Sequence, residues 1–281
     1  MYSTLVDTDT LANHLDDPAW VIIDCRFALT DPGAGRRAYA AGHIPGARYA
    51  HLDEDLSGPV TPASGRHPLP DPQRLAERFG AWGIAPGRQV AAYDDSFGAI
   101  AARLWWLLRW LGHREVALLD GGLPKWTREG RPMTAEPPRV TPAHFEPRVA
   151  PDVWVDTAFV ERVRADPNYR LIDVRGEERF NGEVEPFDKV AGHVPGARNV
   201  PYEDNLALSG EFLPPDELRA LYSAVLGDAP PERMIPMCGS GVTACHAVLA
   251  LEHAGLPGAR LYPGSWSEWI TDPRRPVATG S

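Results

Sequence analysis

The chain has 281 residues, of which 43% are hydrophobic and 23% are charged, and its formal net charge is −10. This length allows one large domain or two of ordinary size, and the composition is that of a globular protein, not of a disordered or fibrous chain. The acidic balance argues against nucleic-acid binding, and three cysteines are too few for a disulfide framework.

The beginning of the chain has no basic segment followed by an apolar core, so we expect no signal peptide. The most apolar helix-like stretch, residues 100–111, is interrupted by Arg103 and Arg109. It is also shorter than the about 20 apolar residues that cross a bilayer. We therefore expect no membrane segment, a cytoplasmic location, and cysteines that are thiols.

Short apolar runs alternate with a helix-like segment in the first half. The runs at 21–23, 89–93 and 115–119 are typical of buried parallel strands, and the pattern at 99–111 predicts a helix after the second run. Strands that alternate with helices predict an α/β fold with a mainly parallel sheet and helices on both faces.

The second half repeats three motifs of the first in the same order. Val-Ile-Ile-Asp-Cys-Arg at 21–26 returns as Arg-Leu-Ile-Asp-Val-Arg at 170–175, and Ala-Gly-His-Ile-Pro-Gly-Ala-Arg at 41–48 returns at 191–198 with only Ile changed to Val. Asp-Gly-Gly-Leu-Pro-Lys-Trp at 120–126 is echoed by Pro-Gly-Ser-Trp-Ser-Glu-Trp at 263–269. The repeat predicts two related domains, and motifs present in both halves are assigned to the scaffold.

A proline-rich stretch separates the two halves. Proline occurs six times between residues 131 and 151, which predicts an extended, non-helical linker because proline fixes φ and lacks an amide donor. We therefore expect a first domain over residues 1–136, a linker over 137–151 and a second domain over 152–281.

One cysteine stands where the second predicted sheet would present a ligand site. In the second half, strands are predicted at 171–172, 233–237 and 260–262 and a helix at 242–254. Cys238 follows the middle strand, at the sheet edge where α/β proteins bind ligands. In the loop Cys-Gly-Ser-Gly-Val-Thr at 238–243, the glycines allow a tight turn whose amides and following helix would stabilise a thiolate, the nucleophilic form.

Two observations bear on that interpretation. A buried cysteine at a strand end is also a common packing residue, and this alternative stays open from the loop alone. The corresponding position of the first half is Asp94, which is not a sulfur nucleophile. Only the second half can therefore perform cysteine chemistry.

Together, the paired Gly-His-Ile/Val-Pro-Gly-Ala motifs, the two tryptophan motifs and the loop at 238–243 resemble those of two-domain rhodanese-type sulfurtransferases. The resemblance covers nearly the whole chain and implies two rhodanese-like domains, the first inactive and the second carrying the catalytic Cys238. It implies no metal and no cofactor. Sulfur would pass from a donor to a Cys238 persulfide and then to cyanide, a thiol or a protein such as a thioredoxin-like one.

The loop is most similar to that of the 3-mercaptopyruvate subgroup. The thiosulfate subgroup typically has basic residues after the cysteine, where cations would attract a dianion. Here Gly239 and Ser240 are neutral. The resemblance therefore implies 3-mercaptopyruvate as the donor, with thiosulfate as the alternative.

The resemblance also assigns roles to individual residues. Ser240 and Asp53 match members of a proton relay with the cysteine, and His67 matches a histidine near the substrate. Arg179 matches the first of two arginines that bind the donor, and its alternative role is a surface salt bridge with Glu177 or Glu183. The loop residues that would line the donor site are Gly239, Gly241, Val242 and Thr243.

The chain departs from the family pattern at the second arginine. Where the family has Glu-Pro-Arg, this sequence has Glu185-Pro186-Phe187, and an aromatic ring cannot bind an anion as arginine does. Arg66 or Lys189 is expected to substitute.

Four other functions are weighed against sulfur transfer. A cysteine phosphatase needs an arginine six residues after the nucleophile, but residue 244 is alanine. A metal site or a redox disulfide built from Cys238 and Cys245 is disfavoured because the intervening helix holds the two apart. A non-catalytic sulfur-binding module stays open, and it predicts a stable persulfide without turnover.

Overall fold

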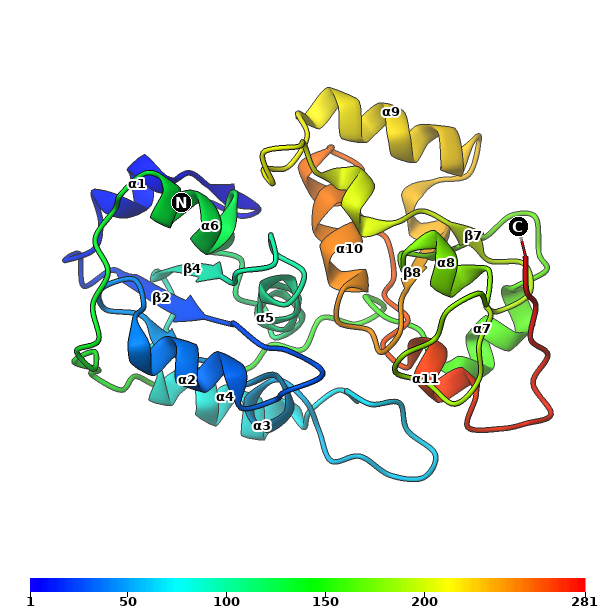
Figure 1. Cartoon of the computed structure of the whole chain (residues 1–281), viewed down its shortest axis with the longest axis horizontal. Coiled ribbons are helices and arrows are strands. Elements are labelled where there is room, and N and C mark those ends of the chain that lie inside the picture. Colours follow the sequence, from blue (N-terminus) through cyan, green and yellow to red (C-terminus); the bar gives the residue numbers. More distant parts are fainter. Residues whose placement is uncertain (281) are drawn as a thin grey trace. The chain divides into compact units, whose positions relative to one another are not determined.

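The structure is a computed structural model that describes residues 1–280. The chain forms two compact units (Figure 1). The first consists of Met1–Gly58, Pro70–Ala150 and Leu208–Glu211, and the second of Pro59–Leu69, Pro151–Ala207 and the chain from Phe212 onward. Among residues 1–280, no helix has both the length and the apolar character needed to cross a membrane.

The first unit is built on a parallel sheet of five strands in the order β1-β5-β4-β2-β3. Its elements are β1 Leu5–Val6, α1 Thr8–Ala12, β2 Trp20–Asp24, α2 Ala34–Ala41, β3 Arg48–Tyr49, α3 Leu52–Asp55, α4 Pro72–Ala81, β4 Gln89–Tyr93, α5 Ala101–Trp110, β5 Val116–Leu119 and α6 Gly122–Arg128. Leu11 of α1 and Trp126 of α6 share a buried core with Ile22 and Ala91 of the sheet. Figure 1 shows α2 and α4 on the opposite side of β2 and β4.

The second unit repeats this plan with a smaller parallel sheet in the order β7-β6-β8. Its elements are α7 Thr157–Val163, β6 Arg170–Asp173, α8 Glu177–Phe180, β7 Arg198–Asn199, the 3-10 helix η1 Tyr202–Asn205, α9 Pro215–Leu226, the 3-10 helix η2 Pro231–Arg233, β8 Met234–Met237, α10 Ala244–His253 and α11 Ser265–Trp269. One core joins α7 and α11 to the sheet through Val160, Leu171, Ile235 and Trp266. Helix α10 packs against β8 and α9. The expected class, two α/β domains with parallel sheets and helices on both faces, is confirmed.

The strand expected at 260–262 is the exception, because only an isolated bridge between Leu261 and Trp154 forms there. The amides of Arg260 and Tyr262 donate to the carbonyls of Met234 and Pro236, at 3.0 and 2.9 Å. A continuous parallel ladder would also need an amide of residue 236 to donate back, and Pro236 has none. Residues 260–262 therefore do not form a third strand beside β8, and only the isolated bridge to Trp154 is present.

The scaffold assignment of the repeated motifs agrees with their contacts. Asp24 pairs with Arg26 at 2.6 Å, and Asp173 pairs with Arg175 at 2.7 Å. In each unit the same arginine also donates to the carbonyl of the glycine before the motif histidine, Gly42 or Gly192, at 2.7 Å. The same buried ion pair thus ties the strand end to the Gly-His turn in both halves.

The two observed units are divided less simply along the chain than the expected domains and linker. Residues 137–150 contain no helix or strand, and they fold with the first unit. The amides of Ala143 and Arg148 bond to the carbonyls of Gly80 and Leu111 at 2.9 Å, and Phe145 is buried. Two short segments fold with the other half: 59–69 belongs to the second unit and 208–211 to the first.

Candidate active site

Cys238 directly follows β8 and begins the loop that leads into α10. Its side chain is buried. Its backbone is fixed by the first residues of α11: the Cys238 amide donates to Ser265 Oγ at 3.0 Å, and its carbonyl accepts from the Trp266 amide at 3.0 Å. The strand end and the start of α11 together hold Cys238 at the carboxyl edge of the sheet.

The two glycines of the loop have different surroundings, and the backbone requires glycine at 241. Gly241 has φ +75°, and a Cβ there would overlap the Pro263 carbonyl oxygen. A Cβ at Gly239 would lie 2.9 Å from Arg66 Nη2 and 3.4 Å from Arg179 Nη2. Glycine at 239 thus leaves space for two guanidinium groups beside the cysteine.

The first unit shows what a loop of this kind binds. Asp94, which holds the position of Cys238 in the repeat, is fully buried, and its carboxylate accepts four backbone amides. These amides belong to Ser96 (2.9 Å), Gly98 (2.9 Å), Ile100 (2.8 Å) and Ala101 (2.7 Å). In the first unit, the turn from strand to helix is therefore a nest that holds an anion.

Ser240 forms a buried hydrogen bond with His67, a residue of the 59–69 segment. Ser240 Oγ lies 2.7 Å from His67 Nδ1, and the two residues are 5% and 3% exposed. The hydroxyl is two residues from Cys238. The pair offers one hydroxyl and one imidazole for moving a proton near the sulfur.

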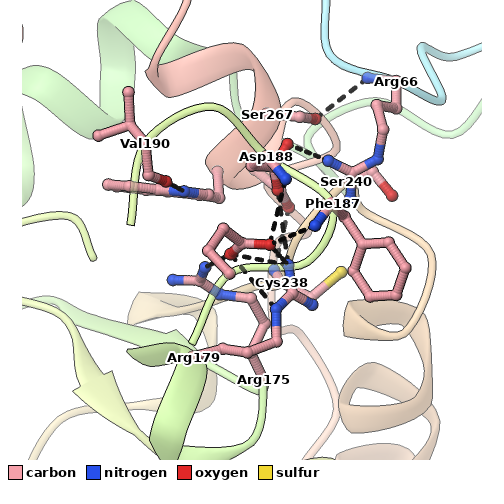
Figure 2. A network of polar contacts seen from close by, with 12 residues as sticks. Arg66, Arg175, Arg179, Phe187, Asp188, Val190, Cys238, Ser240 and Ser267 are labelled. Atoms are coloured by element: carbon pink, nitrogen blue, oxygen red, sulfur yellow. Dashed lines mark hydrogen bonds and ion pairs between the residues drawn. The ribbon is translucent and has the colours of Figure 1, made fainter. Parts of the chain in front are cut away.

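Three arginines surround the loop, and all three are paired with carboxylates (Figure 2). Arg66 Nη1 pairs with Asp188 Oδ1, and Arg179 Nη2 lies 3.5 Å from Asp188 Oδ2. Arg179 also pairs with Glu185 at 2.7 Å, and Arg175 lies 3.2 Å from Glu185. The carboxyl side chains of Glu185 and Asp188 are almost completely buried.

Arg175 belongs to the scaffold and to this cluster at once. Burial disfavours its charged form, but the carboxylates of Asp173 and Glu185 and the nearby Cys238 raise the pKa of the guanidinium above its ordinary value. Arg175 therefore stays a fixed cation near the sulfur. Sequence reasoning did not single it out, because Arg26 repeats it in the half that has Asp94 in the place of Cys238.

Most of the residues predicted for the site come together in the second unit. Arg66 and Arg179 flank Gly239, His67 meets Ser240, and the remaining loop residues lead to Thr243 at the start of α10. The partners of Arg179 are Glu185 and Asp188, not the expected Glu177 or Glu183. Phe187 covers the Arg179 guanidinium, with 5.0 Å from Cζ to the ring centre.

Other expected residues lie elsewhere. Asp53 is an exposed residue of α3 in the first unit. Lys189 is exposed, so the cation beside Gly239 is Arg66. Sequence reasoning missed Glu185 and Asp188 as partners of the arginines, although the acidic residues on both sides of Phe187 were a usable signal. Cys25 and Cys245 are buried, and no disulfide forms within residues 1–280.

Comparison with known proteins finds relatives that cover nearly the whole chain. The model of the "Rhodanese-like domain" family matches residues 7–129 and 157–272. A protein of Pseudomonas aeruginosa named "Probable 3-mercaptopyruvate sulfurtransferase" is 50% identical, over 98% of this chain and 98% of its own length. The thiosulfate sulfurtransferase of Cricetulus griseus is 34% identical, over 96% and 93%.

A solved structure gives the same result. The crystal structure of SseA from Escherichia coli, described as a 3-mercaptopyruvate sulfotransferase, superposes with a TM-score of 0.79 at 35% identity. It covers 95% of this chain and 100% of that one. The chain belongs to the rhodanese family, and the resemblance carried by its sequence motifs is confirmed.

Proposed function

We propose that the protein is a sulfurtransferase that moves a sulfane sulfur from 3-mercaptopyruvate, through a persulfide on Cys238, to cyanide or a thiol. The observation that carries the proposal is the contrast between the two repeated loops. In the first unit the loop holds the Asp94 carboxylate on four amides, and in the second it begins with a cysteine flanked by arginines. A cysteine with guanidinium groups beside it is placed where an anionic donor can reach its sulfur.

In the first half-reaction, the Cys238 thiolate attacks the donor sulfur and the donor C–S bond breaks. The bonding electrons leave with the three-carbon fragment as the pyruvate enolate. The thiol proton of the donor ends on that carbon, giving pyruvate and the Cys238 persulfide anion. Atoms and charge balance without a cofactor.

The donor proton needs a path from sulfur to carbon. We assign this transfer to Ser240 and His67, whose side chains are hydrogen-bonded at 2.7 Å in a buried place. Asp53 is retained in the relay on the resemblance to the family. Arg179 and Arg66 would bind the donor carboxylate and carbonyl, because Phe187 occupies the place of the second arginine of the family.

In the second half-reaction, the acceptor attacks the outer sulfur of the persulfide and the S–S bond breaks. Cyanide leaves as thiocyanate, a thiol leaves as its persulfide, and the Cys238 thiolate is restored. A thioredoxin-like protein is one thiol acceptor that this chemistry accommodates, and a cytoplasmic location is part of the proposal.

The charges beside the loop favour a monoanionic donor. Arg66, Arg175 and Arg179 are matched by three carboxylates, those of Asp173, Glu185 and Asp188. A cluster without excess positive charge offers little extra attraction to a dianion such as thiosulfate. The named relatives include enzymes for both donors, so thiosulfate is the second candidate.

The test compares the three cysteines and the two donors. We expect Cys238→Ser to abolish sulfur transfer to cyanide, while Cys25→Ser and Cys245→Ser keep it. The intact mass after donor treatment should rise by one sulfur atom only when Cys238 is present. Wild-type kcat/KM should be higher with 3-mercaptopyruvate than with thiosulfate.

Each of the other outcomes has a definite meaning. Transfer by Cys238→Ser would overturn the nucleophile. A stable persulfide without turnover would identify a sulfur-binding module. A preference for thiosulfate would replace the donor and leave the persulfide chemistry intact.

A further inference from the structure

The Asp188 carboxylate lies between the two guanidinium groups that flank Gly239. One oxygen pairs with Arg66, and the other lies 3.5 Å from Arg179 Nη2 (Figure 2). The Asp188 side chain is 5% exposed, whereas the arginine side chains are 26% and 21% exposed. A carboxylate of the protein itself therefore already occupies a site of the type that a carboxylate donor needs.

This resting arrangement does not satisfy Arg66. Its Nε is buried and has no acceptor among residues 1–280. Its Nη2 faces the space beside Gly239, where a Cβ would lie 2.9 Å away. A buried donor without an acceptor costs free energy, and a bound donor that gives Nε an oxygen would recover this cost.

Asp188 sits on a segment that can release it. It belongs to the stretch between α8 and β7, which has no helix or strand from 181 to 192. The Asp188 amide donates to Glu185 Oε1 at 3.2 Å, and the neighbouring Phe187 and Lys189 are exposed. Glu185 pairs with two arginines, Arg175 and Arg179, and so anchors the loop. Asp188 follows three residues later, next to the exposed Lys189.

We propose that Asp188 is a built-in competitor for the donor. In the resting enzyme its carboxylate occupies the site of Arg66 and Arg179, and the donor carboxylate displaces it on binding. The inference rests on the proposed function for the identity of the donor as an anionic carboxylate. Ambient anions that bind arginine weakly fail to displace Asp188, so the loop excludes them.

Removal of the competitor should strengthen anion binding. We expect Asp188→Asn to lower the KM for 3-mercaptopyruvate on the order of tenfold, because the fraction of enzyme with an open site rises. Inhibition by sulfate and acetate should become stronger by a similar factor. Asp188→Ala, which removes both oxygens, should give the same direction.

The matched control is Glu183→Gln on the same loop. Glu183 is exposed and contacts only Asn181 at 3.4 Å through its side chain within residues 1–280, and its replacement changes the net charge by the same amount. The KM and the inhibition constants of this variant should stay within twofold of the wild type. A shift equal to that of Asp188→Asn would mean that net charge alone causes the effect, and would overturn the proposal.

A second measurement separates this inference from the proposed function. Alkylation of Cys238 by anionic iodoacetate and by neutral iodoacetamide needs no sulfur donor. Asp188→Asn should raise the ratio of the iodoacetate rate to the iodoacetamide rate on the order of tenfold. If the wild type does not turn over 3-mercaptopyruvate but Asp188→Asn raises this ratio, the assignment of the donor is wrong. The proposal that Asp188 competes with anions is then still supported.

The opposite role for Asp188 gives the opposite result. If the carboxylate instead holds the arginines in position for the donor, Asp188→Asn should raise the KM and lower the alkylation ratio. Either change, in a variant with wild-type thermal unfolding, would overturn the proposal. A variant with altered unfolding would be replaced by Asp188→Ser for the same two measurements.

Discussion

Replacing Asp94 by alanine should strongly destabilise the first unit, although Asp94 lies in the half without a nucleophile. The carboxylate is fully buried and accepts amides from Ser96, Gly98, Ile100 and Ala101 at 2.7–2.9 Å. Alanine leaves four amides, in the turn before α5 and at its first residue, without their acceptor. Buried donors that lose a charged partner are costly, because water does not replace it.

The size of the effect follows from these bonds. Hydrogen bonds to a charged group contribute about 1.5–3 kcal/mol each, but the four share one carboxylate and its desolvation offsets part of the gain. We therefore expect a loss of about 3–5 kcal/mol in the free energy of unfolding. At about 2–4 °C per kcal/mol, the melting temperature of the first unit should fall by about 10 °C.

Asp71 provides a matched comparison in the same unit. It caps α4 and accepts the amides of Gln73 and Arg74 at 3.0 Å, but it is exposed. Asp71→Ala should cost only about 1 kcal/mol, the usual value of a helix cap. Asp94→Asn should fall between the two alanine variants, because one carboxamide oxygen can accept but its NH2 faces other donors.

Scanning calorimetry of the full chain measures these shifts, with chemical denaturation as a second measure. Because the chain has two units, the transitions are to be fitted separately where they resolve. If Asp94→Ala lowered the melting temperature no more than Asp71→Ala, the view of this loop as an anion nest would be refuted. The first unit would then no longer support the argument that a loop of this kind stabilises an anion.

Two further predictions concern reactivity and the proton path. Burial, together with nearby carboxylates, raises the pKa of the Cys25 thiol well above its ordinary value, so it stays protonated and unreactive at pH 8. Iodoacetamide should label Cys238 before Cys25, and peptide mapping that found Cys25 labelled first in the folded protein would contradict this. His67→Ala should slow sulfur uptake from 3-mercaptopyruvate about a hundredfold, while release of sulfur from a preloaded persulfide to cyanide changes much less. Separate assays of sulfur uptake and sulfur release measure the two effects. Equal slowing of both half-reactions would mean that His67 only supports the structure of the loop.

Local sequence determined the plan of the fold because each unit folds from neighbouring strand, turn and helix segments. The apolar runs predicted β2, β4, β5, β6 and β8, and the repeat predicted two domains of one type. The position of Cys238 after a strand, with Asp94 as its counterpart, was also readable, because both depend on the order of residues along the chain. Pro236 was a local signal that was overlooked, and it explains why the expected strand at 260–262 is only a bridge.

The partners in the site were decided by tertiary structure. The segment 59–69 folds with the second unit because residues far apart in sequence meet there: the Arg66 amide donates to Ser267 Oγ at 3.1 Å, and His67 bonds to Ser240. No periodicity or spacing encodes such contacts, since they depend on how loops pack. The same reason explains Arg179, whose charge is matched by Glu185 and Asp188 across a loop and not by the nearest acidic residues along the chain. The sequence by itself determined which residue we propose as the nucleophile, and only the folded loops determined which charges surround it.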